Sequence, residues 1–172
     1  MTATETSLKN FQSDVDQWMA ENVPKNPGFL LPLTFLEVGT EQQLDFLRDW
    51  QHKLWSAGFL GMHWPTQYGG QGSDAAYQGI VDKALTAHNA PIIFNTIGLN
   101  WTGPLLLDVG TEEDRQRYIK NILTGDEIWC QGFSEPDHGS DLGNVQTKAV
   151  RDGDEYIVNG SKIWTTLGNY AD

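Results

Sequence analysis

Apolar residues recur at helical spacing through the first part of the chain. Five of them fall at i, i+3, i+7, i+10 and i+11, on one face of a helix: Leu8, Phe11, Val15, Trp18 and Met19. Pro24 follows and cannot continue a helix. We therefore expect a first helix that ends before Pro24 and buries this stripe in a core.

A second helix is predicted after the irregular segment 23–39. Residues 40–43, Thr-Glu-Gln-Gln, have the form of a capping box, and Gly58 supplies a natural C-terminal stop. The apolar residues between these two signals share one face: Leu47, Trp50 and Leu54. This segment carries the clearest helix signals of the chain.

A third helix is predicted to start at Ser73 or Asp74, since either residue can cap its N-terminus. Apolar residues between 77 and 85 share a face with His88. A histidine at the end of such a stripe more often packs, or faces the C-terminal dipole of the helix, than binds a ligand.

Two more apolar or capped segments complete the helical part. Segment 91–110 is the most apolar of the chain and is expected to be a buried helix, interrupted by Gly98, Gly103 and Pro104. Its small residues let another surface approach closely, and packing in the core is the interpretation we favour. Residues 111–114, Thr-Glu-Glu-Asp, form another capping box, and Gly125 closes the helix that follows.

The hydrophobic period changes from 3.6 to 2 after residue 126. Short strands are expected over 128–133, 146–150, 156–158 and 162–166, with hairpin turns at Asp152-Gly153 and Asn159-Gly160. We thus predict a multidomain α+β chain: an all-α helical domain over 1–126, then the first antiparallel strands of an incomplete β-barrel-like domain over 127–172. Because no closing strand precedes Asp172, the second domain is expected to be truncated.

Composition narrows the function classes. The chain has 172 residues, 39% hydrophobic content, seven Trp and a formal net charge of −12, so we expect a folded acidic protein. Such a surface repels nucleic-acid phosphates and anionic lipid, which argues against both partners. Cys130 is the only cysteine, no apolar run reaches ~20 residues and no targeting signal is visible, so the cytoplasm is the expected location.

Two other kinds of site are not expected. The four histidines are far apart and lack a second ligand at metal spacing: His52, His63, His88 and His138. The Gly-Gly-x-Gly run at 69–72 follows no strand of β-branched residues and lacks Gly-Lys-Ser/Thr. We interpret it as a structural connection and not as a phosphate-binding loop.

Two segments carry the candidate chemistry. Residues 129–142 run from an apolar strand into a polar loop, in which Pro136 and Gly139 hold the backbone open and Ser134 and Ser140 offer hydroxyls and amides. Residues 162–166, Lys-Ile-Trp-Thr-Thr, add an indole and two hydroxyls. Stacking on an aromatic ring with hydroxyls at the edge suits a planar, heteroatom-rich cofactor.

Together the two segments resemble the acyl-CoA dehydrogenase family. The resemblance rests on Ser-Glu-Pro-x-x-Gly-Ser-Asp at 134–141 and Asn-Gly-x-Lys-x-Trp-x-Thr at 159–166. It implies a helical N-terminal domain, a β-barrel-like middle domain and a C-terminal helical bundle. It also implies FAD as the cofactor, oxidation of an acyl-CoA thioester to the 2,3-enoyl-CoA, and transfer of electrons to an electron-transfer flavoprotein or similar acceptor.

The resemblance also assigns roles residue by residue. It places Phe133 and Ser134 at the pyrimidine edge of the flavin, Gly139 and Ser140 toward the pyrophosphate, and Thr166 near the hydride-accepting nitrogen. Ser140 also matches a position that meets the CoA part of the substrate. The full set of expected FAD-binding residues is Gln131, Phe133, Ser134, Gly139, Ser140, Trp164, Thr165 and Thr166. In the family, segment 91–110 lies along the base of the acyl-binding cavity, so a contribution to a pocket stays open.

The chain departs from the family pattern in two ways. Asp137-His138 replaces the usual Gly-Ala: a carboxylate would repel a pyrophosphate, a protonated imidazole would attract it, and both side chains could simply face solvent. In the family, the carboxylate that removes the α-proton lies on the C-terminal helical domain. We do not expect such a domain within these 172 residues. Glu135 and Asp141 belong to the flavin loop and are not assigned as the base, so this chain alone is expected to be inactive.

Three functions therefore stand side by side. The chain is expected to be part of an FAD-dependent acyl-CoA dehydrogenase of fatty acid or sterol catabolism. The alternatives are a non-catalytic structural subunit of a hetero-oligomer, and a flavin oxidase or monooxygenase of the same fold. By family analogy we expect a homo- or hetero-oligomer.

Overall fold

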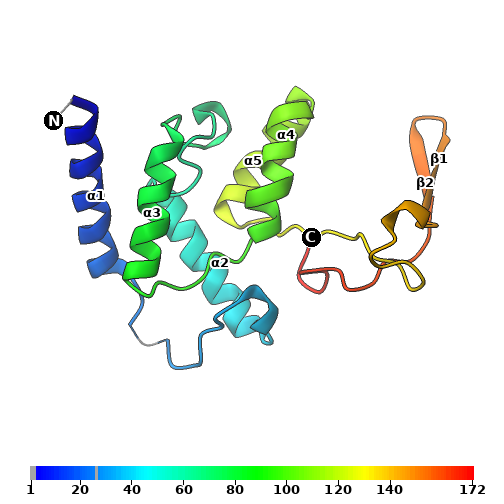
Figure 1. Cartoon of the computed structure of the whole chain (residues 1–172), viewed down its shortest axis with the longest axis horizontal. Coiled ribbons are helices and arrows are strands. Elements are labelled where there is room, and N and C mark those ends of the chain that lie inside the picture. Colours follow the sequence, from blue (N-terminus) through cyan, green and yellow to red (C-terminus); the bar gives the residue numbers. More distant parts are fainter. Residues whose placement is uncertain (1–2, 26) are drawn as a thin grey trace. The chain divides into compact units, whose positions relative to one another are not determined.

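The computed structural model describes residues 3–25 and 27–172, and the chain divides into two compact units, Met1–Ile128 and Trp129–Asp172 (Figure 1). The first unit is helical and the second contains a short antiparallel sheet. The α+β class predicted from the change of period is therefore confirmed. The predicted domain boundary, between residues 126 and 127, lies close to the division between the units and stays a prediction.

The α-helices of the first unit are α1 (Ala3–Asn22), α2 (Glu41–Ser56), α3 (Ala75–Ala87), α4 (Gly103–Val109) and α5 (Glu112–Thr124). Three of them, α2, α3 and α5, start where local capping signals predict them. The Thr40 side chain accepts a hydrogen bond from the N–H of Gln43 at the start of α2, and Asp74, not Ser73, caps α3. Thr111 and Asp114 form the predicted reciprocal capping box of α5.

The core of the first unit lies between α1, α2 and α3. Its buried residues come mainly from the predicted stripes: Val15, Met19, Trp50, Leu54, Phe59, Met62, Val81 and Ala84. Trp18 packs against Phe59 with ring centroids 5.2 Å apart, and Phe11 packs edge-on against Tyr77 with ring centroids 4.9 Å apart. His88 is the C-cap of α3, and its Nε2 lies 3.5 Å from Oδ1 of Asp16 on α1.

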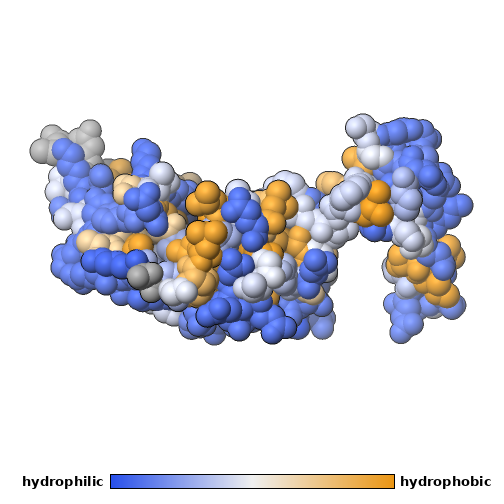
Figure 2. Space-filling model, turned by 90° about the horizontal axis from the view of Figure 1, so that it is seen from below, coloured by the Kyte–Doolittle hydropathy of each residue, from blue (hydrophilic) through white to orange (hydrophobic). Residues whose placement is uncertain are grey.

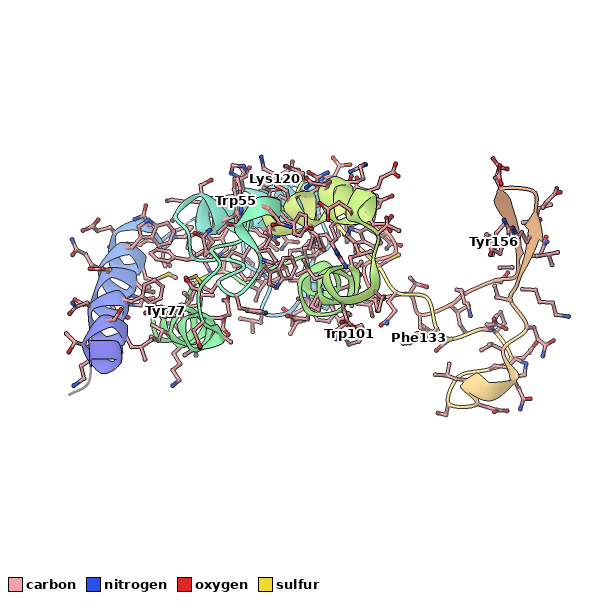
Figure 3. All side chains as sticks on the ribbon, turned by 90° about the horizontal axis from the view of Figure 1, so that it is seen from above. Trp55, Tyr77, Trp101, Lys120, Phe133 and Tyr156 are labelled. Atoms are coloured by element: carbon pink, nitrogen blue, oxygen red, sulfur yellow. The ribbon has the colours of Figure 1, made fainter. Side chains whose placement is uncertain are left out.

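Segment 91–110 differs from the single buried helix expected there. A π-helical turn, η3 (Gly98–Thr102), leads into α4. Trp101, labelled in Figure 3, is 53% exposed, and Leu105 and Val109 are 59% and 69% exposed. Pro104 explains the irregular turn, because it has no N–H to donate to a helical carbonyl. The large apolar residues that are buried lie at the start of the segment: Phe94 is 0% and Ile97 5% exposed.

A buried pair of amides holds the C-terminal end of α5, and the hydrophobic pattern gave no sign of it. Gln51 Nε2 donates to the carbonyls of Ile122 and Leu123 at 2.9 and 3.1 Å. Asn95 Nδ2 donates to the carbonyls of Ile122 and Glu127 at 3.1 and 2.8 Å. Both side chains are 0% exposed. The network satisfies helix-end carbonyls that have no partner within α5.

The second unit contains one hairpin, β1 (Lys148–Asp152) and β2 (Glu155–Asn159), paired antiparallel from Lys148↔Asn159 to Asp152↔Glu155. Gly153 and Asp154 form its turn, one residue later than predicted, and Gly153 has φ +64°. Every side chain of the two strands is exposed, and Figure 2 shows apolar residues on the surface of this hairpin.

The other two predicted strands are wrong. Segments 128–133 and 162–166 share a single antiparallel bridge, Gln131↔Thr166, and form no ladder. Asn159-Gly160 therefore makes no second hairpin. Trp164 has φ +54°, and this left-handed conformation breaks the extended backbone that a strand requires.

Within the described part of the chain, no helix has the length and apolarity needed to cross a membrane.

Candidate functional site

The two motif segments, which the chain separates by more than twenty residues, lie side by side in the second unit. The N–H of Ile163 donates to the carbonyl of Ser134 at 2.9 Å, and the backbones of Gln131 and Thr166 form an isolated antiparallel β-bridge. We call residues 131–140 and 162–166 the lip. Six of the eight predicted cofactor-binding residues thus lie on or next to the two paired backbones: Gln131, Phe133, Ser134, Trp164, Thr165 and Thr166.

The side chain of Glu135 connects the first lip segment to the rest of the second unit through hydrogen bonds. Its carboxylate is buried, since the residue is only 4% exposed. Oε2 accepts from the N–H of Gln146 at 2.5 Å, and Oε1 accepts from the N–H of Thr147 and from Lys162 Nζ, both at 2.9 Å. Lys162 Nζ also donates to the carbonyl of Phe133 at 3.0 Å. One carboxylate therefore joins three segments of the second unit.

The same surroundings keep Glu135 ionised. The Thr147 side chain, the N–H of Gln146 and the Lys162 ammonium hold the pKa of this carboxyl well below its usual range. A carboxylate that is already paired and stabilised in its charged form is a poor proton acceptor. Sequence reasoning rejected Glu135 as the base but missed its contacts, because burial of a polar residue in a loop leaves no periodic signal.

A tight turn follows Glu135. The N–H of Glu135 donates to the carbonyl of His138 at 2.8 Å, and the N–H of His138 returns the bond at 3.1 Å. Asp137 is exposed at the tip of this turn, and His138 is partly buried. Gly139 and Ser140 follow in an exposed bend, outside the bonds that pair the two lip segments.

Two aromatic rings of the lip are open to solvent. Trp164 is 87% exposed and Phe133 is 55% exposed. Phe133 is labelled in Figure 3. A left-handed backbone conformation is rare for a bulky residue and stores strain, yet Trp164 adopts it at φ +54° while leaving its ring uncovered. Ser134, Thr165 and Thr166 beside these rings are half-buried. Open rings next to hydroxyls are suited to a planar ligand with polar edges.

The helical unit contributes a cavity of its own, about 320 Å³ in volume. The residues that line it include Leu60, His63, Gln78, Ile93, Thr96 and Leu99. Segment 91–110 thus contributes to the core through Phe94 and Ile97, and to the lining of this cavity through Ile93, Thr96 and Leu99. Its role in an acyl-binding pocket stays a prediction. Among the side chains that the structure describes, those of residues 6–25 and 27–172, no cluster of three or more His, Cys, Asp or Glu could hold a metal ion.

Comparison with protein families covers both units. Residues 8–126 match the family described as "Acyl-CoA dehydrogenase, N-terminal domain", and residues 130–172 match "Acyl-CoA dehydrogenase, middle domain". Acyl-CoA dehydrogenase IpdE1 of Mycolicibacterium smegmatis is 34% identical over 175 residues, which cover 95% of this chain and 44% of that relative.

Solved structures give the same result. The Tcur3481-Tcur3483 steroid ACAD superposes with a TM-score of 0.74 at 33% identity, covering 97% of this chain and 41% of the other. A glutaryl-CoA dehydrogenase of Mycobacterium smegmatis in complex with FADH2 has a TM-score of 0.64 at 26% identity, covering 96% of this chain and 40% of the other. The chain therefore spans less than half the length of these proteins.

Proposed function

Because the chain belongs to the acyl-CoA dehydrogenase family, we propose that it supplies the FAD-binding lip and part of the acyl cavity of an enzyme that oxidises an acyl-CoA thioester to the 2,3-enoyl-CoA. The observation that carries this proposal is the pairing of the two lip segments through Ile163 and Ser134. It brings an exposed indole, a phenyl ring and three hydroxyls to one place.

The residues present fit an isoalloxazine ring. Trp164 and Phe133 offer uncovered aromatic surface, and the hydroxyls of Ser134, Thr165 and Thr166 can donate to the ring edge. Glu135 is the buried acid of the lip, and the positive charge of Lys162 compensates its negative charge. Glu135 therefore adds little repulsion toward a phosphate. The FADH2 complex of the related glutaryl-CoA dehydrogenase supports FAD as the cofactor.

FAD, when bound, supplies the ring that accepts the hydride. The chain's own residues bind and orient it: we assign Phe133 and Ser134 to the pyrimidine edge, Gln131 to the lining of the isoalloxazine ring, and Thr166 to the vicinity of the accepting nitrogen. Trp164 excludes water from a ring face. Gly139 and Ser140 are assigned to the pyrophosphate, with Ser140 also placed toward the CoA moiety.

The base that removes the α-proton is proposed to lie outside these 172 residues. Glu135 is unsuitable, because its lone pairs already accept from Gln146, Thr147 and Lys162. The acyl group is proposed to extend along the cavity lined by Ile93, Thr96 and Leu99, and the steroid relative supports a bulky acyl group. We further propose a cytoplasmic enzyme that passes electrons to an electron-transfer flavoprotein.

An oligomer is part of the proposal. The exposed apolar residues of the hairpin, Val150, Ile157 and Val158, are 60%, 51% and 64% exposed, and a two-stranded sheet is marginal in water by itself. The paired name of the steroid relative supports a second chain of the same family as a partner.

The test is an FAD titration of the 172-residue chain, followed by removal of unbound cofactor and a visible absorption spectrum. We expect a retained, perturbed flavin spectrum, and about three- to tenfold weaker binding in Trp164→Ala from the loss of stacking. Trp101→Ala is the matched control, because Trp101 is an exposed indole of the helical unit, 53% exposed. A colourless native chain, or equal binding by both variants, would contradict the proposal.

A further inference from the structure

Glu135 is unusual in a unit that buries few polar groups. It is 4% exposed, whereas its neighbours Pro136, Asp137 and Gly139 are all exposed. A buried carboxylate is costly unless each of its oxygens accepts good hydrogen bonds. Both oxygens of Glu135 do so.

The donors come from segments that are distant in the chain. Gln146 and Thr147 donate their N–H groups just before β1, and Lys162 donates its ammonium just after β2. The chain that enters the hairpin Lys148–Asn159 and the chain that leaves it are therefore both hydrogen-bonded to the carboxylate of Glu135. This close approach of the two segments requires a glycine at position 160, because a Cβ there would collide with Thr147.

The same contacts determine how the two lip segments lie. Lys162 binds Glu135 and the carbonyl of Phe133, and the next residue, Ile163, donates its N–H to the carbonyl of Ser134. These bonds place the first lip segment against the second at the residues proposed to meet the flavin. The Glu135–Lys162 pair is thus adjacent to the flavin-facing backbone without being part of it.

We propose that Glu135 is a positioning residue for FAD, which sets the spacing of the two lip segments through Lys162 and the N–H groups of Gln146 and Thr147. It touches neither the flavin nor the substrate. The inference rests on the proposed function and adds to it a residue that no flavin contact would reveal. Its carboxylate is required because it is acceptor-only, whereas a glutamine amide would present an N–H₂ to donors.

The test compares Glu135→Gln with Glu155→Gln in the 172-residue chain. Both changes are the same replacement and remove one negative charge from the second unit, but Glu155 lies on β2, outside the lip, and is exposed. We expect Glu135→Gln to weaken FAD binding by about tenfold or more, and Glu155→Gln to change it by less than about twofold. At saturating FAD, Glu135→Gln should also shift the bound flavin spectrum, because displaced donors alter the polarity at the ring edge.

Amide hydrogen exchange of the FAD-free chain gives an independent reading. In Glu135→Gln, the N–H groups of Gln146, Thr147 and Ile163 should lose protection, while amides of the helical unit keep theirs. Lys162→Met is the second variant: it keeps two of the bonds to Glu135, so we expect a smaller loss of FAD affinity and the same spectral shift. Combined with Glu135→Gln, it should weaken binding little further.

The outcomes separate the two proposals. If the native chain retains FAD and Glu135→Gln binds it with unchanged affinity and spectrum, the positioning role is wrong and the proposed function stands. If Glu135→Gln loses protection throughout the helical unit as well, Glu135 has a general structural role and the inference is overturned. If the native chain retains no FAD, the proposed function fails and this inference fails with it.

Discussion

Replacing Asn95 is the sharpest test of how the buried amides stabilise the C-terminal end of α5 in the helical unit. Asn95 Nδ2 donates to the carbonyls of Ile122 and Glu127, and the side chain is 0% exposed. In Asn95→Ala, Gln51 still donates to Ile122, so the carbonyl of Glu127 is the one that loses the donor shown here. An unsatisfied buried acceptor costs about 1–3 kcal/mol, and the small cavity adds about 1 kcal/mol. We therefore expect the free energy of unfolding to fall by about 2–4 kcal/mol.

Asn95→Asp distinguishes the hydrogen bonds from the volume. The aspartate has nearly the same shape, but it places an acceptor where the two carbonyls need a donor, so it should destabilise the unit more than alanine does. Urea unfolding followed by tryptophan fluorescence measures both variants. Asn121→Ala is the control, since its Nδ2 makes only a 3.3 Å bond to Arg117 within α5, and it should change stability by less than about 0.5 kcal/mol. Equal stability of Asn95→Asp and the native chain would refute the reasoning.

Two further predictions concern acid and packing. Because the pKa of Glu135 is lowered from its usual 4.5, the folded chain binds a proton at this carboxylate less readily than the unfolded chain does. The ionised carboxylate therefore stabilises the folded state fully above pH 4.5, and this stabilisation is lost as the pH falls below 4.5. Glu135→Gln should therefore flatten the pH dependence of unfolding of the second unit, measured from about pH 3 to pH 6, and an unchanged profile would contradict the lowered pKa. Gly103→Ala should destabilise the helical unit by about 1–3 kcal/mol in thermal unfolding, because its Cβ would collide with the buried Trp64 ring. Gly79→Ala on α3, where a Cβ meets nothing within 4 Å, should instead stabilise it by about 0.5–1 kcal/mol, and the same sign for both variants would reject the packing argument.

The helices could be predicted because their signals are local. Thr40, Asp74 and Thr111 cap the helices that follow them, and each cap is completed within three residues of the capping side chain. The apolar stripes between the caps then select the buried face. These features need no knowledge of the rest of the fold.

The strands and the site's supporting contacts could not be predicted in the same way. A strand needs a partner, and segment 162–166 has the composition of a strand but turns at Trp164 into a left-handed conformation. Glu135 and Asn95 are polar residues whose burial depends on donors and acceptors far away in the chain. The motif indicated which residues gather at the lip, but it did not indicate what holds them there.

The central claim is that segments 131–134 and 163–166 form one FAD site. Its most direct test is an NMR titration of the labelled 172-residue chain with FAD, following the backbone amides of both segments. The account predicts that amides of the two segments shift together with one affinity, while those of the exposed hairpin turn at Gly153 and Asp154 do not. Shifts confined to one segment, or shifts that follow different affinities in the two, would contradict it.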